Sequence, residues 1–323
     1  MQNSVFSLEQ KNFEEIAIQV FNFQYLHNPT YKNYCDLLNC NPKKVEKLID
    51  IPFLPISFFK THEVKTEQFE PEIVFSSSGT TGLTTSKHFV KSLEIYEKSF
   101  LQHFESIYGS IYDYCVLALL PSYLERTGSS LIYMVNAFIQ KSKSEESGFF
   151  LNELDQLKTL LEKQNEKKLK TLLIGVSFAL LDFVDQFQLA ENDNLIVMET
   201  GGMKGRKKEI VREELHRQLK VGFGVKAIHS EYGMTELLSQ AYAPKNGRFF
   251  TPNWMKVLIR EHDNPFDYAT SNEIGGINVI DLANLYSSAF IQTDDLGKLH
   301  NDGSFEVLGR FDAAEVRGCN LLI

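Results

Sequence analysis

A loop suited to binding a polyphosphate follows the short apolar run at residues 73–75. It consists of serines, threonines and glycines, and a lysine follows shortly after it. Hydroxyl groups, backbone N–H groups that glycine leaves accessible, and a nearby cation together suit phosphate oxygens. The residues that we expect to contact phosphate are Ser76, Ser77, Ser78, Gly79, Thr80, Thr81, Gly82 and Lys87.

This loop is not a Walker A sequence, because no Gly-Lys-Ser/Thr closes it. A flexible surface turn can have the same composition, so the loop alone leaves both interpretations open. Three later patches of the chain carry the remaining groups that a nucleotide site needs.

The second patch is Thr200-Gly-Gly-Met-Lys-Gly205, directly after an apolar run. Gly201 and Gly202 would let a flat base lie against the backbone, although a plain tight turn explains them equally well. The third patch is His229-Ser-Glu-Tyr-Gly-Met-Thr-Glu236.

In the third patch, the ring of Tyr232 can stack on a base, and Gly233 follows it. The Thr235 hydroxyl can bind a phosphate, and the Glu236 carboxylate is a candidate ligand for Mg²⁺.

The fourth patch runs from Thr293-Asp-Asp-Leu-Gly297 to Gly309-Arg-Phe-Asp312. Asp295 can hold a ribose diol by accepting two hydrogen bonds, because an ionised carboxylate is an acceptor only. Arg310 can bridge a ribose and a phosphate.

Taken in this order, the four patches resemble the adenylate-forming superfamily of acyl-CoA synthetases, luciferase-type enzymes and peptide-synthetase adenylation domains. Residues 76–87 look like its phosphate loop, and Tyr232-Gly-Met-Thr-Glu236 matches its Tyr-Gly-x-Thr-Glu motif. Gly309-Arg-Phe-Asp312 matches its Gly-Arg-x-Asp hinge motif, and Thr293-Asp-Asp295 is similar to its Thr-Gly-Asp. The resemblance implies an enzyme that uses ATP and Mg²⁺ to convert a carboxylic acid into an acyl adenylate.

In most of the superfamily, a small C-terminal domain follows the hinge motif and carries a lysine that assists adenylation. This sequence ends at Ile323, shortly after the hinge, and is in this respect similar to the LuxE-type acyl-protein synthetases of bacterial bioluminescence. Residues 51–60 and 317–323 also look like that subfamily. The resemblance implies the α/β fold of the N-terminal domain of adenylate-forming enzymes, layered sheets flanked by helices, without the C-terminal domain. Lys87 or Lys204 would then take over part of the work of the missing lysine.

LuxE-type proteins take the acyl group as a thioester onto their own cysteine near the C-terminus and pass it to a partner acyl-CoA reductase. Cys319 fits that acceptor role, since Arg317 nearby would favour the thiolate and a thiol attacks an acyl adenylate readily. The other interpretation of Cys319 is a small apolar residue in a terminal strand. The resemblance therefore implies a long-chain-fatty-acid–protein ligase with Cys319, Lys87, Thr235 and Glu236 as catalytic residues.

Two other functions remain open. The acceptor could be coenzyme A or a carrier-protein thiol, as in acyl- or aryl-CoA ligases related to phenylacetate-CoA ligase. Alternatively, the chain could be a non-catalytic subunit that binds acyl groups or nucleotides. The 25 phenylalanines suit a fatty or other hydrophobic acid, but they do not identify it.

The composition excludes several other classes. The 323 residues carry a net charge of −9 and no basic block, so we expect no nucleic-acid partner. No apolar run approaches the ~20 residues of a membrane span, and no signal peptide is evident, so the cytoplasm is the expected location. The four cysteines form no Cys-x-x-Cys pair, which disfavours metal sites and disulfides.

The elements that must position these patches can be predicted from periodicity. Apolar strands alternate with helices between residues 114 and 230, which predicts an α/β layered fold with buried parallel strands. From residue 248 onward, strands at 254–259, 276–280 and 288–291 are followed by a hairpin turned on Asn301-Asp-Gly303.

Residues 7–49 are predicted to be mostly helical, with one helix opening at Asn41-Pro42 and continuing through Leu48. The prolines in residues 51–60 exclude a regular helix there, and this apolar segment either lines a pocket or pins the helical segment to the core. We expect a helical segment at 1–50, an adenylate-forming core at 51–312 and a tail at 313–323, packed as one compact unit.

Overall fold

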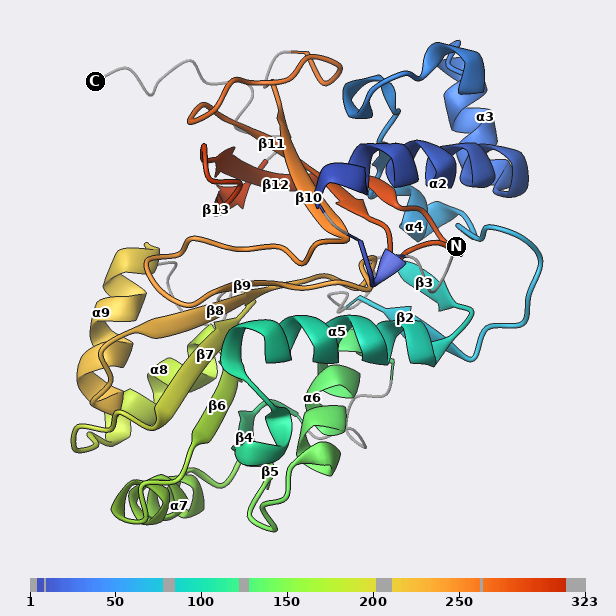
Figure 1. Ribbon diagram of the computed structural model, residues 1–323. Coiled ribbons are helices and arrows are strands. Elements are labelled where there is room, and N and C mark those ends of the chain that lie inside the picture. The colour runs from blue at the N-terminus through green and yellow to red at the C-terminus, as the bar shows by residue number, and fades with distance from the viewer. Residues whose placement is uncertain are drawn as a thin grey trace. The chain divides into compact units, whose positions relative to one another are not determined.

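A computed structural model describes residues 5–8, 10–77, 85–121, 128–201, 211–261 and 264–311 (Figure 1). The chain divides into two compact units, and each is treated separately below. The first unit comprises residues 1–70, 88–91 and 250–323, and the second comprises residues 71–87 and 92–249. The sequence analysis expected one compact unit. In the structure, the N-terminal and C-terminal parts of the chain build the first unit together. The division at residues 50 and 312 stays a prediction.

The second unit is built on a six-stranded sheet with the order β5-β4-β6-β7-β8-β9. Neighbouring strands are parallel except at β9, which runs antiparallel to β8. Every residue of the central strands β4 and β6 is buried, as the continuous apolar runs predict. The strands are β4 (Cys115–Leu119), β5 (Gly148–Phe149), β6 (Thr171–Val176), β7 (Leu195–Thr200), β8 (Ile228–Tyr232) and β9 (Ala241–Ala243).

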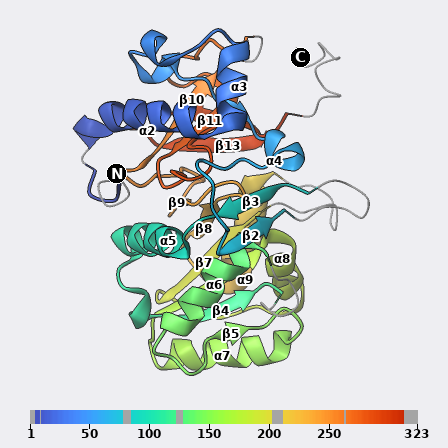
Figure 2. The same ribbon diagram turned by 90° about the vertical axis from the view of Figure 1, so that its right-hand side faces the viewer.

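Helices cover both faces of this sheet (Figures 1 and 2). On one face, α8 packs against α9 through Phe183 and Phe223, whose rings stack with centroids 5.1 Å apart. On the other face, α5 meets α6 through Phe100 and Phe138. The helices are α5 (Leu93–Tyr108), α6 (Ser130–Lys141), α7 (Leu154–Glu166), α8 (Ser177–Gln186) and α9 (Arg212–Phe223), and a 3-10 turn covers Ile111–Asp113.

The first unit contains a five-stranded sheet in which β12 is central. β12 pairs with β11 along one side, and with β1 and then β13 along the other. Helices α2 and α3 lie beside β10–β12 (Figures 1 and 2). The elements are α2 (Phe13–His27), α3 (Pro29–Leu37), β1 (Leu54–Pro55), α4 (Phe58–Thr61), β10 (Met255–Arg260), β11 (Ile274–Asp281), β12 (Phe290–Leu299) and β13 (Phe305–Arg310), with a 3-10 turn at Gln10–Asn12. β2 (Ile73–Ser76) and β3 (Lys87–Val90) flank the Ser/Gly/Thr loop in the sequence.

The helix predicted to open at Asn41 is wrong. Asn41 does cap a turn by accepting a hydrogen bond from the Lys43 N–H, but only the 3-10 turns Pro42–Lys44 and Leu48–Asp50 form. The Asp50 carboxylate accepts hydrogen bonds from the backbone N–H groups of Glu46 and Lys47. These local side-chain acceptors compete with a continuous helix.

The apolar segment at residues 51–60 joins the sheet. This agrees with the interpretation that the segment pins the helical residues to the core. Its strand β1 pairs in parallel with β12, with Leu54 opposite Ile291. One further boundary differs from the predictions. β12 is one continuous strand through Thr293–Asp295, which the sequence analysis had left between a strand and the hairpin.

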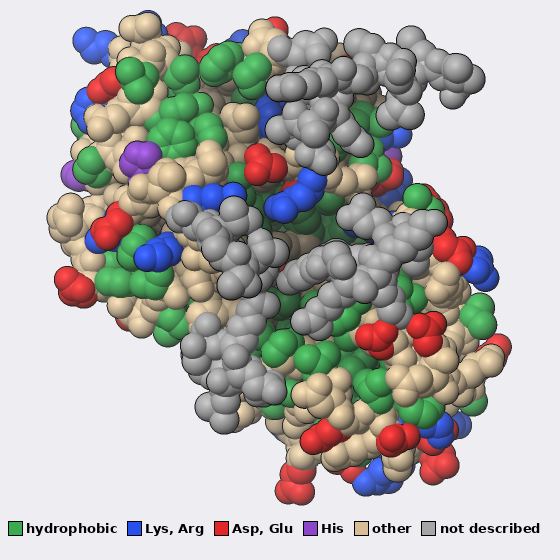
Figure 3. All heavy atoms as spheres, turned by 180° about the vertical axis from the view of Figure 1, so that it is seen from behind, with side chains coloured by type: hydrophobic (Ala, Val, Ile, Leu, Met, Phe, Trp, Pro, Cys, Tyr) green, Lys and Arg blue, Asp and Glu red, His purple; other side chains and the backbone are tan. Residues whose placement is uncertain are grey.

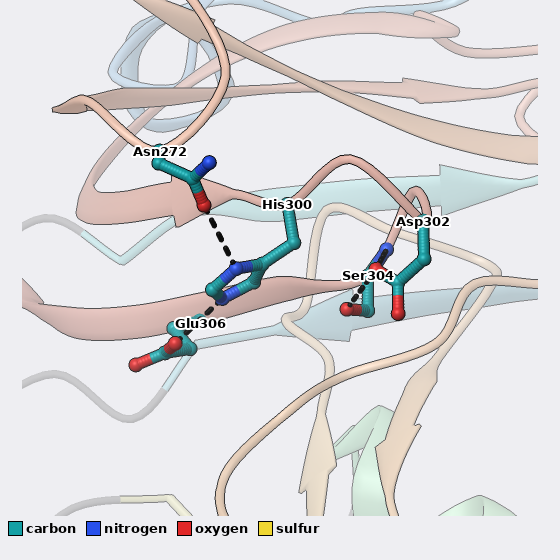
Figure 4. A network of polar contacts seen from close by, with 5 residues as sticks. All are labelled: Asn272, His300, Asp302, Ser304 and Glu306. Carbon is teal, nitrogen blue, oxygen red and sulfur yellow. Dashed lines mark hydrogen bonds and ion pairs between the residues drawn. The ribbon is translucent and has the colours of Figure 1, made fainter.

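The predicted hairpin at Asn301-Asp-Gly303 is confirmed. Gly303 has a φ of +82°, and the Asp302 carboxylate accepts hydrogen bonds from both the backbone N–H and the hydroxyl of Ser304. Figure 4 shows His300 between Asn272 and Glu306, with its Nε2 2.6 Å from a Glu306 oxygen. The end of β12 and the start of β13 are therefore fixed by side chains as well as by the strand ladder.

On the face drawn in Figure 3, acidic and basic side chains of the described residues are interspersed. None of the described helices is both long and apolar enough to cross a membrane.

The fully buried side chain of Gln24 joins α2 to the loop that precedes β12. Its Nε2 donates to the carbonyl oxygens of Asn284 and Leu285, and its Oε1 accepts from the Ala289 N–H. Three backbone groups that water cannot reach are satisfied by this one side chain.

We predict that Gln24→Met lowers the free energy of unfolding by about 2–5 kcal/mol, because it leaves these buried backbone groups unpaired. Gln19→Met, at an exposed position of the same helix, is the matched control and should change stability by no more than about 0.5 kcal/mol. Urea denaturation measures both. Equal effects of the two substitutions would show that the Gln24 hydrogen bonds contribute nothing specific.

Candidate active site

The two ends of the Ser/Gly/Thr loop are tied together in the second unit. The Ser77 N–H donates to the Ser86 carbonyl, and the Ser86 N–H donates to Ser77 Oγ at 3.0 Å. The Ser76 N–H donates to the carbonyl of Gly128, which holds β2 against the start of the α6 segment. Lys87 is exposed at the first position of β3. Ser78, Gly79, Thr80, Thr81 and Gly82 lie outside the described residues, so phosphate binding by the loop stays a prediction.

Polar side chains gather at the carboxyl ends of β6, β7 and β8, the edge at which open α/β sheets bind ligands. The parallel register sets Val176 beside Thr200, and Thr200 beside Glu231. Gly201 follows directly with a φ of +67°, so its position favours glycine for a tight turn. Its carbonyl accepts a hydrogen bond from Ser177 Oγ at 2.7 Å. Gly202 is outside the described part of the chain.

Two buried glutamates lie on adjacent strands at this edge. Glu199 on β7 is 5% exposed, and its carboxylate accepts a hydrogen bond from Ser177 Oγ. Arg212 Nε and His216 Nε2 of α9 lie 3.8 Å and 3.6 Å from Glu199 Oε1. Burial by itself would raise the pKa of Glu199, but the nearby His216 imidazole and the Arg212 charge more than offset it and lower that pKa.

Glu231 on β8 has the opposite character. Burial, together with the charge of Glu199, raises its pKa to about 7, although a hydrogen bond from Thr200 acts against that shift. Environments that push two neighbouring carboxyl pKa values apart are typical of functional sites. The sequence analysis missed both glutamates. The signal it overlooked was a glutamate at the second-last position of each strand, Glu199 in β7 and Glu231 in β8.

The Tyr232–Glu236 turn begins at the last residue of β8. The Tyr232 ring packs edge-on against Phe249, with centroids 5.9 Å apart, and the residue is 8% exposed. Thr235 is half-buried and Glu236 is buried. The turn is therefore anchored in the core at its start and at its end.

Gly233 lies against the end of the Glu231 side chain. A Cβ added at this position would lie under 3.0 Å from Glu231 Oε1, closer than real Cβ atoms come to other heavy atoms. The carboxyl group of Glu231 thus occupies the space that a side chain at residue 233 would need. Thr200, Glu231 and Gly233 form one contact cluster within the second unit.

In the first unit, the structure brings Asp295 and Arg310 together. They are directly opposite one another on β12 and β13, and Arg310 Nε lies 3.3 Å from Asp295 Oδ1. The Arg310 side chain is 77% exposed, so this pair contributes little to stability. Thr293 Oγ1 accepts a hydrogen bond from the Asp295 N–H and donates to the Ile277 carbonyl, which fixes the backbone that carries Asp295.

Arg260 is a buried residue near this patch that the sequence analysis missed. Its guanidinium donates to the carbonyls of Ile277 and Thr293 and to Asn278 Oδ1, at 2.8–3.0 Å. Burial lowers its pKa, while the charges of Asp294 and Asp295 act against that shift. The guanidinium fits because the residue opposite Arg260 on β11 is Gly276, where an added Cβ would meet it. An arginine at a strand end opposite two consecutive glycines was the overlooked signal.

The donor set suits a magnesium ion that is shared with a substrate. The described residues contain no group of three or more His, Cys, Asp or Glu side chains arranged to hold a metal. Mg²⁺ commonly uses one or two carboxylates, with phosphate oxygens and water completing its shell. Glu236, a buried residue of the Tyr232–Glu236 turn, is the candidate ligand for that mode, and the described residues form no closed protein cage.

Comparison with known families matches residues 4–111 to the family described as "Acyl-protein synthetase, LuxE". The long-chain-fatty-acid–luciferin-component ligase of Photorhabdus luminescens is 32% identical over 76 residues. That alignment covers 23% of this chain and 65% of that protein, which is slightly less than two thirds of the relative.

Solved structures of ligases share the fold. An open conformation of 2-hydroxyisobutyryl-CoA ligase in complex with 2-HIB-AMP and CoA matches 92% of this chain and 73% of that chain, with a TM-score of 0.65 and 11% identity. ATP-bound MatB from Rhodopseudomonas palustris matches 76% of this chain and 49% of that chain, with a TM-score of 0.56 and 17% identity. The α/β fold of the N-terminal domain of adenylate-forming ligases, predicted from the sequence, is confirmed over most of the chain.

The Glu231–Gly233 contact gives a stability prediction. Gly233→Ala should lower the free energy of unfolding by about 1–3 kcal/mol, because the new methyl group displaces a buried carboxyl that Thr200 holds. In a Glu231→Ala background the space is open, so the same Gly233→Ala change should cost less than about 0.5 kcal/mol. Thermal or urea unfolding of the four proteins of this cycle measures the coupling. Equal costs in both backgrounds would contradict the contact.

Proposed function

We propose that this chain, whose residues 4–111 match the LuxE acyl-protein synthetase family, activates a carboxylic acid with ATP to form an acyl adenylate. The observation that carries the proposal is the location of the Tyr232–Glu236 motif. It begins at the last residue of β8, at the carboxyl ends of parallel strands, in a fold shared with ATP-bound MatB. A long-chain fatty acid is the proposed substrate, which the name of the Photorhabdus relative supports.

In the first half-reaction, a carboxylate oxygen of the acid attacks the α-phosphorus of ATP. The bond from that phosphorus to the bridging oxygen breaks, and pyrophosphate leaves. Loop residues 76–82 steady the β- and γ-phosphates, and Lys87 and Thr235 stabilise the charge that develops at the α-phosphorus. Glu236 would hold Mg²⁺, which when bound neutralises phosphate charge. The base would lie against Gly201, Gly202, Tyr232 and Gly233, and Asp295 and Arg310 would hold the ribose.

In the second half-reaction, the thiolate of Cys319 attacks the carbonyl carbon of the acyl adenylate. A thioester forms and AMP leaves. Cys319 lies outside the described residues, so this step rests on the family resemblance. The described cysteines support it indirectly, because burial raises the pKa of the Cys35, Cys40 and Cys115 thiols and makes each a poor nucleophile at neutral pH. An acyl-CoA reductase would then accept the acyl group.

A second candidate function is an acyl-CoA ligase, in which coenzyme A takes the acyl group in place of Cys319. The observation in its favour is the likeness to 2-hydroxyisobutyryl-CoA ligase with CoA bound, which covers most of this chain.

Thr235→Val should lower the rate of acid-dependent ATP–pyrophosphate exchange by about 10²-fold, because it removes a hydroxyl donor to the reacting phosphate. Thr159→Val, at an exposed position of α7 in the same unit, is the matched control and should leave the rate unchanged. Exchange by the unsubstituted protein should be measured against acids graded by chain length. Absence of exchange with every acid, while ATP still binds, would favour a non-catalytic subunit.

Incubation with ATP and a labelled fatty acid should give a hydroxylamine-labile protein adduct that Cys319→Ser abolishes. Cys40→Ser is the control and should label fully, because its half-buried thiol donates to the Asp50 carbonyl and burial raises its pKa. If Cys319→Ser still forms acyl-CoA at the parent rate when coenzyme A is added, the ligase function is correct and the acceptor assignment is wrong.

A further inference from the structure

The carboxyl group of Glu231 touches both of the sequence patches at the edge of the second unit's sheet. Glu231 Oε2 accepts a hydrogen bond from Thr200, the residue that opens the Thr200–Gly205 patch. Glu231 Oε1 fills the space beside Gly233, the second residue of the Tyr232–Glu236 turn. β7 and β8, which carry these residues, are parallel neighbours (Figure 1). The buried side chain of Glu231 therefore lies between the backbone of the turn and the neighbouring strand β7.

Among the residues that the structure describes, the groups that face Glu231 leave its charge uncompensated. From β7 it meets the Thr200 hydroxyl and the negative charge of Glu199. From α5 and β9 the nearby titratable groups are Tyr96 and Tyr242, both neutral because burial raises their pKa values well above the usual range. The α9 side chains Arg212 and His216 pair with Glu199.

We propose that Glu231 is a positioning residue that couples proton binding to the geometry of the Tyr232–Glu236 turn, so that the turn binds nucleotide when Glu231 is protonated. The proposal rests on the proposed function, since the nucleotide is ATP.

Charge explains the direction of this coupling. Ionised Glu231 places a second buried negative charge beside Glu199 and next to a turn that must receive an anionic nucleotide. Like charges in a low-dielectric interior repel strongly, so ionisation favours movement of the carboxyl group and of the turn that packs on it. Protonation removes the repulsion and keeps the Thr200 hydrogen bond. Because the pKa of Glu231 is about 7, both forms are populated at neutral pH.

The test uses Glu231→Gln, which has nearly the shape of protonated Glu and cannot ionise. The dissociation constant of α,β-methylene ATP with magnesium is measured by calorimetry from about pH 6 to about pH 8 for both proteins. Both proteins are measured with the same nucleotide, so the ratio of their dissociation constants does not depend on the ionisation of the nucleotide. If only the protonated form binds, the parent should bind about tenfold more weakly than Glu231→Gln at pH 8, and about equally well at pH 6. Glu213→Gln, at an exposed position of α9, should behave like the parent throughout.

A second readout needs no nucleotide. Hydrogen exchange of the peptide that covers residues 230–240 should be faster in the parent than in Glu231→Gln at pH 8, and equal at pH 6. If exchange follows this pattern but neither protein binds nucleotide, the coupling holds and the proposed function fails. If nucleotide binds with a pH-independent ratio and the exchange rates stay equal, the positioning role is wrong while the proposed function stands.

Discussion

Glu199 and Glu231 are buried on neighbouring strands, at the carboxyl ends of parallel strands. The rest of the candidate site depends on whether each carboxyl group is paired or protonated. A buried carboxylate is costly unless it is paired or protonated. Glu199 is paired, through Ser177, Arg212 and His216. Glu231 has one hydroxyl donor and a like charge beside it, and its raised pKa follows from that. The Glu231 carboxyl also occupies the space beside Gly233.

The sequence predicted the second unit well because its strands are buried on both faces. A strand of this kind is a continuous apolar run, and β4 and β6, which are buried at every residue, lie within the predicted alternation of strands and helices. The motif at Tyr232–Glu236 was recognised from its residues alone, and its place at the end of β8 came from the structure. The Asn301-Asp302-Gly303 turn was also predictable, since Gly303 has a positive φ that few other residues adopt.

The sequence could not show which strands pair with one another or in which register they pair. The contact of Glu231 with Thr200 depends on the register of β7 and β8, and the pocket for the Arg260 guanidinium depends on the pairing of β10 with Gly276. Neither is encoded in local spacing. The helix expected after Asn41 failed for a local reason, because Asp50 binds the backbone of residues 46 and 47. Propensity rules do not weigh such a competing acceptor.

The central claim is that a carboxylic acid is activated as its adenylate. The most direct measurement follows oxygen from a fatty acid labelled with ¹⁸O in its carboxylate, with ATP and hydroxylamine present to release the activated acyl group. Attack on the α-phosphorus predicts one labelled oxygen in the AMP that is formed, detected by mass spectrometry. Label in inorganic phosphate, with ADP as the nucleotide product, would contradict the account.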